Sequence, residues 1–298
     1  MNDSHCHFFS NQFFTTLSAQ RGRGQSVADL CGELQWDDPG TPDALAERWI
    51  RELDDNDVGR AALIASVPGD EASVASAISR YPGRLVGFFM LDPSASDAVD
   101  RTRRAIGELG LRGVCLFPAM NHVPLSDSRV QAVVEIAASH PGTAVFVHCG
   151  VLSVGVRRKL GLPSKFDLRL GDPLGVARLA LAYPNLPFII PHVGAGMFRE
   201  ALMAADTCAN VHLDTSSSNS WIRYTPGLTL DAVFKTALAV AGARRLLFGT
   251  DSSFFPRGWQ RGIYDAQKAA IADIGLSPAD EALIFGGNFD RLFPPAAV

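Results

Sequence analysis

The sequence predicts one α/β domain over residues 1–298, a (β/α)8 TIM barrel with a short C-terminal closing helix. Short runs rich in Val, Ile, Leu and Phe alternate with amphipathic stretches, and eight such strand–helix units fit a 298-residue chain, about the length these barrels use. The apolar runs are continuous, as strands covered on both faces require. No change of composition along the chain marks a second domain.

Each predicted element follows from its local pattern. The predicted strands are the apolar runs 4–9, 60–67, 85–91, 113–118, 144–148, 188–192, 211–215 and 245–249. The predicted helices have apolar residues at helical spacing and cover 42–56, 70–80, 96–109, 127–139, 172–183, 197–206, 230–241 and 263–274. The tail, 277–285 and 288–293, predicts the closing helix. Residues 10–42, rich in Gly, Gln and Asp, and residues 150–171 predict two long loops.

The bulk composition limits the possible partners and the location. The net charge is −4 and no basic block or aromatic-interleaved basic stripe occurs, so nucleic acid is not an expected partner. Five cysteines without a CxxC pair favour a reducing compartment. The first residues lack the pattern of a signal peptide, and no apolar run reaches the ~18 residues of a membrane span. We expect a cytoplasmic protein that acts on a small molecule.

Histidine and aspartate residues end four of the predicted strands. His5 and His7 share one face of the first strand, and His148, His192 and Asp251 end the fifth, sixth and eighth strands. The carboxyl ends of barrel strands meet at the face where barrel active sites lie. Buried imidazoles and carboxylates are costly without partners, and a shared metal would explain all five residues. Histidine and carboxylate ligands without thiolate suit Zn²⁺ and also Mn²⁺, Fe²⁺ or Co²⁺.

The order HxH, His, His, Asp on strands one, five, six and eight resembles the amidohydrolase superfamily. Within it, the chain is most similar to the amidohydrolase-related group that includes aminocarboxymuconate-semialdehyde decarboxylase and aromatic acid decarboxylases. The resemblance spans nearly the whole chain, and its motifs are Pro191-His192-Val193-Gly194, Phe248-Gly249-Thr250-Asp251-Ser252 and the C-terminal Gly286-Gly287-Asn288-Phe289-Asp290-Arg291-Leu292-Phe293.

The resemblance implies a role for each residue of the constellation. His5, His7, His148 and Asp251 would hold one divalent metal ion, zinc or alternatively manganese. His192 would polarise the substrate or move a proton, and Asp251 would accept a proton from the metal-bound water. Related proteins with two metals carry a lysine at the end of strand four. The run 113–118 has none, so we expect a single metal ion.

Two reactions fit this constellation. The leading hypothesis is hydrolysis of a small amide, lactone or ester by a metal-activated water. The alternative is non-oxidative decarboxylation of an aromatic or enoic acid. The decarboxylases often have a glutamate shortly after the His-x-Gly of strand six, whereas this chain has Ala195-Gly196, which favours hydrolysis. A barrel that has lost its activity and acts as a binding protein is a third possibility.

Further residues are candidates for contact with the substrate. The loop 150–171 carries cations that could clamp a substrate carboxylate. The substrate-binding candidates are His122, Arg157, Lys165, Arg199, Trp221 and Arg223. Asp214 shares a face of its strand with His212 and is a candidate for supporting a metal ligand. Cys6 and Cys149 should face away from the site as core residues. Homodimerisation is compatible with the sequence.

Overall fold

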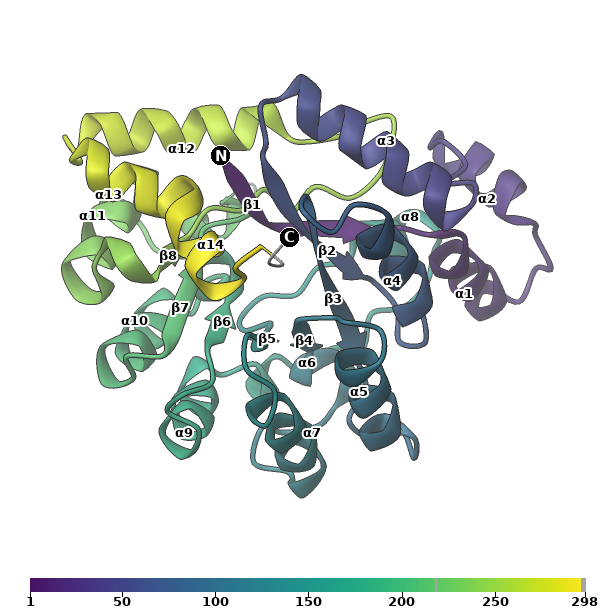
Figure 1. The fold of residues 1–298 in the computed structure, drawn as a ribbon, viewed down its shortest axis with the longest axis horizontal. Coiled ribbons are helices and arrows are strands. Elements are labelled where there is room, and N and C mark those ends of the chain that lie inside the picture. The colour runs from purple at the N-terminus through teal and green to yellow at the C-terminus, as the bar shows by residue number, and fades with distance from the viewer. Residues whose placement is uncertain (218, 296–298) are drawn as a thin grey trace.

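The computed structural model describes residues 1–217 and 219–295 and confirms the predicted TIM barrel (Figure 1). Eight parallel strands lie in the order β1 to β8, each paired with the next. Their bounds are β1 Asn2–Phe8, β2 Arg60–Ala65, β3 Leu85–Leu91, β4 Gly113–Leu116, β5 Ala144–Val147, β6 Phe188–Ile190, β7 Val211–Asp214 and β8 Leu246–Leu247. Beyond β8 the chain closes onto β1, since the Ser4 amide donates to the Phe248 carbonyl at 2.8 Å.

The helices lie outside the sheet, as Figure 1 shows. The main outer helices are α3 Pro42–Asp55, α4 Glu71–Arg80, α5 Ala98–Gly107, α7 Ser128–Ala138, α9 Pro173–Ala182, α10 Phe198–Thr207, α11 Leu230–Ala241 and α12 Arg261–Asp273. Shorter elements occupy the connections and the tail: α6 Pro118–Asn121, α8 Gly155–Lys159, η1 Leu168–Leu170, η2 Pro191–Gly194, η3 Ser220–Tyr224, η4 Ala243–Arg245, α13 Pro278–Ala282, the π-helical η5 Leu283–Gly287 and α14 Asn288–Leu292. No helix in the described ranges is both long and apolar enough to cross a membrane.

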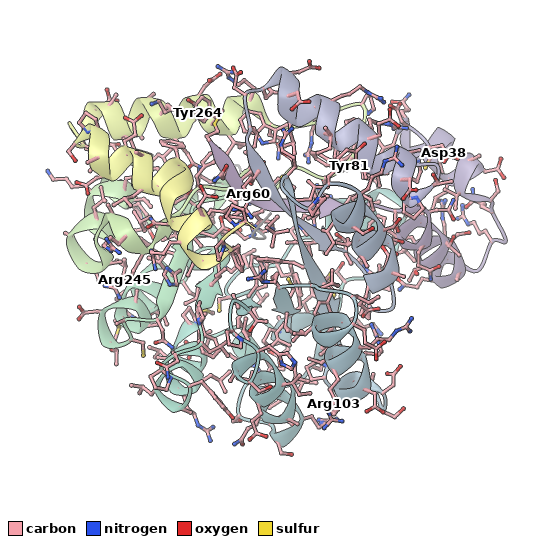
Figure 2. All side chains as sticks on the ribbon, in the orientation of Figure 1. Asp38, Arg60, Tyr81, Arg103, Arg245 and Tyr264 are labelled. Atoms are coloured by element: carbon pink, nitrogen blue, oxygen red, sulfur yellow. The ribbon has the colours of Figure 1, made fainter. Side chains whose placement is uncertain are left out.

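Side chains alternate between the two faces of each strand, so the barrel has an outer core and an inner core. Cys6 packs with the outer core between sheet and helices, and so does Cys149, as the sequence predicts. Phe88 and Phe146 belong to the inner core, where they pack in one cluster with Phe289 of α14. The closing helix is fixed to the barrel by Arg60 at the start of β2, which pairs with Asp290 at 2.5 Å and lies over the Phe289 ring (Figure 2).

The prediction of an irregular loop over 10–42 is wrong. The segment forms α1 (Asn11–Arg21) and α2 (Val27–Leu34) before α3 begins. Ser10 caps α1 through its side chain, and Ser26 begins α2 with a reciprocal capping box to Asp29. The two helices are stabilised by a separate apolar cluster that includes Phe14 and Trp36. Their apolar faces are short and serve tertiary packing, so the abundance of polar residues masked them.

The predicted loop 150–171 is likewise not wholly irregular. It contains the single-turn helices α8 and η1 between β5 and α9. Leu160 and Val156 are buried there and join the same apolar cluster as α1 and α2. These two connections therefore pack against one another at the carboxyl end of the barrel.

Asp70 joins the segment that follows β1 to the start of α4, and replacing it should change folding stability. It is buried and accepts a hydrogen bond from the Ser10 hydroxyl at 2.6 Å. Burial raises the pKa of Asp70 to about 6 from its ordinary value of 3.8. Because the folded-state pKa is the higher one, folding stability falls as pH rises from about 4 to about 6 and stays lower above that.

We therefore expect Asp70→Asn to stabilise the protein at pH 8 relative to wild type and to give little gain at pH 4. The difference between about 6 and 3.8 corresponds to about 3 kcal/mol, an upper value because the amide also weakens the bond from Ser10. Urea unfolding of both proteins at the two pH values measures the effect. A gain that is equal at pH 4 and pH 8 would contradict a titrating buried carboxyl group.

Candidate metal centre and active site

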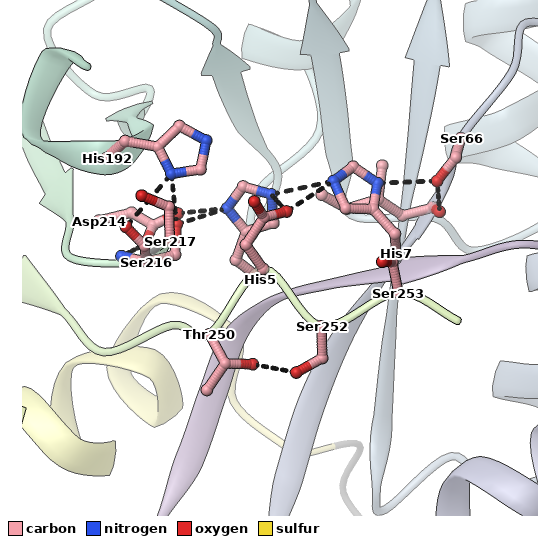
Figure 3. Close-up of polar contacts among 12 residues, drawn as sticks. His5, His7, Ser66, His192, Asp214, Ser216, Ser217, Thr250, Ser252 and Ser253 are labelled. Carbon is pink, nitrogen blue, oxygen red and sulfur yellow. Dashed lines mark hydrogen bonds and ion pairs between the residues drawn. The ribbon is translucent and has the colours of Figure 1, made fainter. Parts of the chain in front are cut away.

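Hydrogen bonds fix the proton positions on the two histidines of β1 (Figure 3). His5 Nδ1 lies 2.7 Å from a carboxylate oxygen of Asp214, an acceptor, so this nitrogen carries the proton. His7 Nδ1 lies 2.8 Å from the hydroxyl oxygen of Ser66, which donates its own proton to the Ile64 carbonyl. His7 Nδ1 therefore donates to Ser66. In both rings Nε2 is left with a free lone pair.

These free lone pairs converge on one carboxylate. The two Nε2 atoms are 3.4 Å apart, and Asp251 Oδ1 lies 3.1 Å from that of His7 and 3.7 Å from that of His5. One ligand atom from each of the three residues lies within 4.8 Å of the other two. Three electron-pair donors at this separation need a shared cation, either a proton or a metal ion, to hold them together. The observed donor set therefore fits a divalent metal ion.

His148 and His192 border this group. The His192 ring stacks on His5 with centroids 5.1 Å apart and meets the His148 ring edge at 5.2 Å. His148 is buried, stacks on Phe117, and its Nδ1 has no hydrogen-bond partner within residues 1–217 and 219–295. His192 Nδ1 lies 2.9 Å from the Ser216 hydroxyl and 3.3 Å from the Ser216 carbonyl. The structure thus brings all five predicted constellation residues together, three of them within ligand distance.

The protonation states agree with a cation site. Burial lowers the pKa of His148 well below its ordinary value, and positive charge on His192 would lower it further, so His148 is neutral. Burial also lowers the pKa of His7. Burial alone would raise the pKa of Asp251, but His7 and His5 outweigh it and the pKa lies below the ordinary value. Burial alone would lower the pKa of His5, but Asp214 outweighs it and the pKa lies above the ordinary value. Metal ligands bind as neutral imidazoles and an ionised carboxylate, so a bound cation would replace any second proton on His5.

Closure of the barrel positions Asp251. Its backbone has a left-handed φ of 59°, and its amide donates to the His5 carbonyl at 2.9 Å. The Gln260 side-chain amide donates to the carbonyls of Thr250 and Asp251 at 2.9 and 3.1 Å. The turn after β8 is therefore held from both sides, and the carboxylate is presented to the two histidines of β1.

Asp3 is a buried carboxyl group that sequence reasoning missed. It accepts hydrogen bonds from the His5 amide, from the amide and hydroxyl of Thr250, and from the Trp259 indole. These bonds join the first strand to the turn that carries Asp251. The signal in the sequence was an aspartate two residues before the HxH pair. Asp214, by contrast, supports His5 in the way the sequence suggested.

The predicted substrate-binding residues lie farther from this group or are engaged elsewhere. Trp221 is buried against Phe198, whereas His122, Lys165 and Arg223 are exposed. Arg157 donates to the Gln20 side chain and to the Pro163 carbonyl. Arg199 is 84% exposed and pairs with Glu200. None of these six has a contact with the five constellation residues among those found in the described parts of the chain.

Arg257 is a cation that sequence reasoning missed. It donates to the Ser253 hydroxyl at 2.7 Å, and its Nη2 lies 3.5 Å from the Asp251 carbonyl oxygen. Its guanidinium group lies 4.4 Å from the centre of the Phe254 ring. Only one of its nitrogens is used by these bonds. The signal available in the sequence was an arginine six residues after the last metal-ligand candidate.

An aromatic wall continues from His7 to Arg257. It consists of Phe9, Phe13, Trp36 and Phe254. The Phe9 ring lies 5.7 Å from the His7 ring and stacks on Phe13 at 3.9 Å. Trp36 lies 6.1 Å from Phe9 and stacks on Phe254 at 3.8 Å. The wall is built by the α1–α2 connection and the turn after β8, and it places apolar ring surface beside a candidate metal centre.

The fold and this donor set define a barrel with a candidate metal-dependent active site at the carboxyl ends of its strands. A family model described as amidohydrolase matches residues 3–294. The chain therefore belongs to the amidohydrolase family and is an enzyme. No curated protein matches it at a significant level.

Solved structures share the fold at low identity. A 5-carboxyvanillate decarboxylase from Novosphingobium aromaticivorans, complexed with manganese and 4-hydroxy-3-methoxy-5-nitrobenzoic acid, is 15% identical with a TM-score of 0.66, covering 98% of this chain and 95% of that one. A probable 2-pyrone-4,6-dicarboxylic acid hydrolase from Acinetobacter baumannii with citric acid bound is 18% identical with a TM-score of 0.61, covering 98% and 99%. A Burkholderia multivorans amidohydrolase with bound zinc is 14% identical with a TM-score of 0.61, also covering 98% and 99%.

Proposed function

We propose that this enzyme is a metal-dependent hydrolase of a small carbonyl compound, an amide, lactone or ester, that also carries a carboxylate. The observation that carries the proposal is the convergence of the Nε2 atoms of His5 and His7 on Asp251. His148, with its unpartnered Nδ1, is the fourth proposed ligand. A divalent cation held by these residues would lower the pKa of a bound water and polarise a carbonyl oxygen.

Asp251 and His192 divide the proton transfers in this proposal. Asp251 accepts the proton of the attacking water, since its carboxylate is ionised and lies at the centre of the ligand group. His192 Nδ1 lies 2.9 Å from the Ser216 hydroxyl, which can donate or accept a hydrogen bond, and 3.3 Å from the Ser216 carbonyl, which can only accept one. We assign proton transfer to His192 and polarisation of the substrate carbonyl to the metal.

Decarboxylation of an aromatic acid is the second candidate, and the aromatic wall favours it. Phe9 lies beside His7, and the Phe254 ring contacts both Trp36 and the Arg257 guanidinium group, so the wall is an apolar aromatic lining with a cation at one end. Apolar and aromatic lining with a few placed polar groups is typical of sites for ring compounds. Arg257 would bind the substrate carboxylate equally well in a hydrolase that acts on an acid.

A substrate panel on the metal-reconstituted enzyme tests the proposal. Lactones, aryl esters and anilides bearing a carboxylate are compared with hydroxybenzoates, with acid release and carbon dioxide release recorded in parallel. Acid release without carbon dioxide supports hydrolysis, and carbon dioxide release from a hydroxybenzoate establishes the second candidate instead. Elemental mass spectrometry of the same preparation identifies the metal. Zinc is the proposed ion and manganese the alternative, because both accept histidine with carboxylate.

Arg257 gives the sharpest test of carboxylate recognition. We expect Arg257→Gln to raise KM for an acidic substrate about 10- to 100-fold with little change in kcat, because a charge-assisted hydrogen bond contributes about 1.5–3 kcal/mol. The methyl ester of the same substrate should show no such effect. Arg261→Gln is the matched control, since Arg261 pairs with Asp265 on exposed α12. Equal losses for the acid and its ester would remove Arg257 from substrate recognition.

Location and assembly remain predictions. All five cysteines are free and buried, which supports the proposed cytoplasmic, reducing environment. Homodimerisation is proposed from the sequence alone.

A further inference from the structure

A second cavity lies at the opposite end of the barrel from the candidate metal centre. Its volume is about 570 Å³, within the range of small-molecule sites. Pro187 and Asn210, which precede β6 and β7, contribute to its walls, as do residues of η4, α14, α13 and the end of α11. These are the amino ends of the strands, whereas Asp214 and the metal ligands lie at or beyond the carboxyl ends. The two sites are therefore separate.

Three arginines line this cavity with one acidic residue, Asp280. Arg245 is engaged by the fold: it donates to the carbonyls of Ala241 and Val240 at the end of α11, and to that of Cys208 after α10. These carbonyls lie at the negative ends of the helix dipoles, and they compensate the positive charge of the Arg245 guanidinium group. Figure 2 shows Arg245 beside these helices.

The other two arginines have unused donors. Arg291 donates through Nη2 to the Arg244 carbonyl at 2.6 Å and to the Asn288 side chain, which fixes its guanidinium group at the cavity wall. Its Nε and Nη1 make no hydrogen bond in the described part of the chain. The Arg244 side chain has neither a hydrogen bond nor an ion pair within residues 1–217 and 219–295. Two exposed guanidinium groups thus lie at one cavity with unused donors, and neither forms an ion pair in the described ranges, although Asp280 also lines the cavity.

His212 forms a buried polar part of the same cavity lining. It is 4% exposed, and its Nδ1 is buried and has no hydrogen-bond partner in the two described ranges. Burial, and then the positive charges of Arg291 and Arg245, lower the pKa of His212 to about 3, so the ring is neutral and has one N–H. Buried polar groups are satisfied in the great majority of cases, and an orphaned one calls for an unseen partner.

We propose that this cavity is a binding site for a small anion with carboxylate or phosphate oxygens. One anionic group bridges the free donors of Arg244 and Arg291, and an oxygen that reaches inward accepts the N–H of His212. The ligand then supplies acceptors for the free donors of the two arginines and for an N–H of the histidine ring that faces the cavity. This assignment is independent of the reaction carried out at the other end of the barrel.

Calorimetric titration of the full-length metal-loaded enzyme with succinate, and separately with inorganic phosphate, tests the proposal. We expect saturable binding of one equivalent of at least one anion. Arg244→Gln and Arg291→Gln should each weaken it about tenfold or more, as loss of a charge-assisted hydrogen bond predicts. Both side chains extend from the surface of the fold, so thermal unfolding should stay close to wild type. His212→Phe, which keeps the ring and removes the N–H, should weaken binding several-fold.

Two control variants locate the bound anion. Arg103→Gln removes an exposed arginine paired with Asp100 on α5 and should leave binding unchanged. Arg257→Gln should weaken only anion binding at the active site, so the binding that depends on Arg244 and Arg291 should persist in that variant. Preference for succinate or for phosphate identifies the anionic group. The proposal is overturned if neither anion binds saturably in the millimolar range. It is equally overturned if Arg244→Gln and Arg291→Gln bind as tightly as Arg103→Gln, or if only Arg257→Gln weakens binding.

Discussion

Asp251→Asn is expected to abolish both metal retention and turnover. The carboxylate lies 3.1 Å from His7 Nε2 and 3.7 Å from His5 Nε2, and it is the only anionic member of the ligand group in the described ranges. An amide of the same shape keeps the hydrogen-bonding oxygen but supplies no charge to balance a dication and cannot take a proton. We expect metal content to fall well below one equivalent, and kcat/KM to fall about 100- to 10,000-fold.

Elemental mass spectrometry and kinetics on the same sample measure this result. Asp265→Asn is the matched control, since Asp265 is an exposed partner of Arg261 on α12. Excess metal should restore little of the activity if Asp251 is also the base. Full metal content with unchanged activity in Asp251→Asn would refute the proposed site. Lost metal with retained activity would instead show that the reaction proceeds without the ion, by acid–base chemistry alone.

His192→Gln is expected to separate turnover from metal binding. His192 stacks on His5, but it is not among the three residues whose ligand atoms lie within 4.8 Å of one another. Glutamine retains a polar end that can bond to Ser216, yet it cannot shuttle a proton near neutral pH. We expect kcat to fall about 100- to 10,000-fold while metal content stays near wild type.

The pH dependence of kcat distinguishes proton transfer by His192 from a merely structural role. Loss of a proton-transferring imidazole should flatten one limb of the kcat profile, and His192→Asn should behave like the glutamine variant. Added imidazole that partly restores the rate would support proton transfer directly. If His192→Gln loses its metal as Asp251→Asn does, His192 is a ligand, and the assignment of His148 to the metal must be revised.

Much of the barrel could be predicted because its strands are buried on both faces. Continuous apolar runs such as Leu85–Leu91 leave little choice of structure, and the structure has that strand at those bounds. The 10–42 segment could not be predicted in this way. Its helices bury only short apolar faces, against Trp36 and residues distant in the sequence, so no local period was strong enough to reveal them.

The candidate site, too, could be predicted only in part. Residue type and strand position were enough to predict that five residues lie together: His5, His7, His148, His192 and Asp251. The reason is that parallel strands in a barrel bring their carboxyl ends to one place. Which arginine lies next to the site could not be predicted from the sequence. Arg157 and Arg199 were as plausible as any arginine until the fold engaged them with Gln20 and Glu200.

By itself the sequence determined the fold class, the family and the set of ionisable residues at the strand ends. These depend on periodicity and residue chemistry, which are local properties. The tertiary structure alone decided which imidazole nitrogen carries the proton, through Asp214 and Ser66, and that Arg257 stands beside the site. It also placed Arg244 and Arg291 at one cavity with His212, whose Nδ1 has no partner within residues 1–217 and 219–295. Such properties depend on distances between side chains from different strands, which no spacing along the chain encodes.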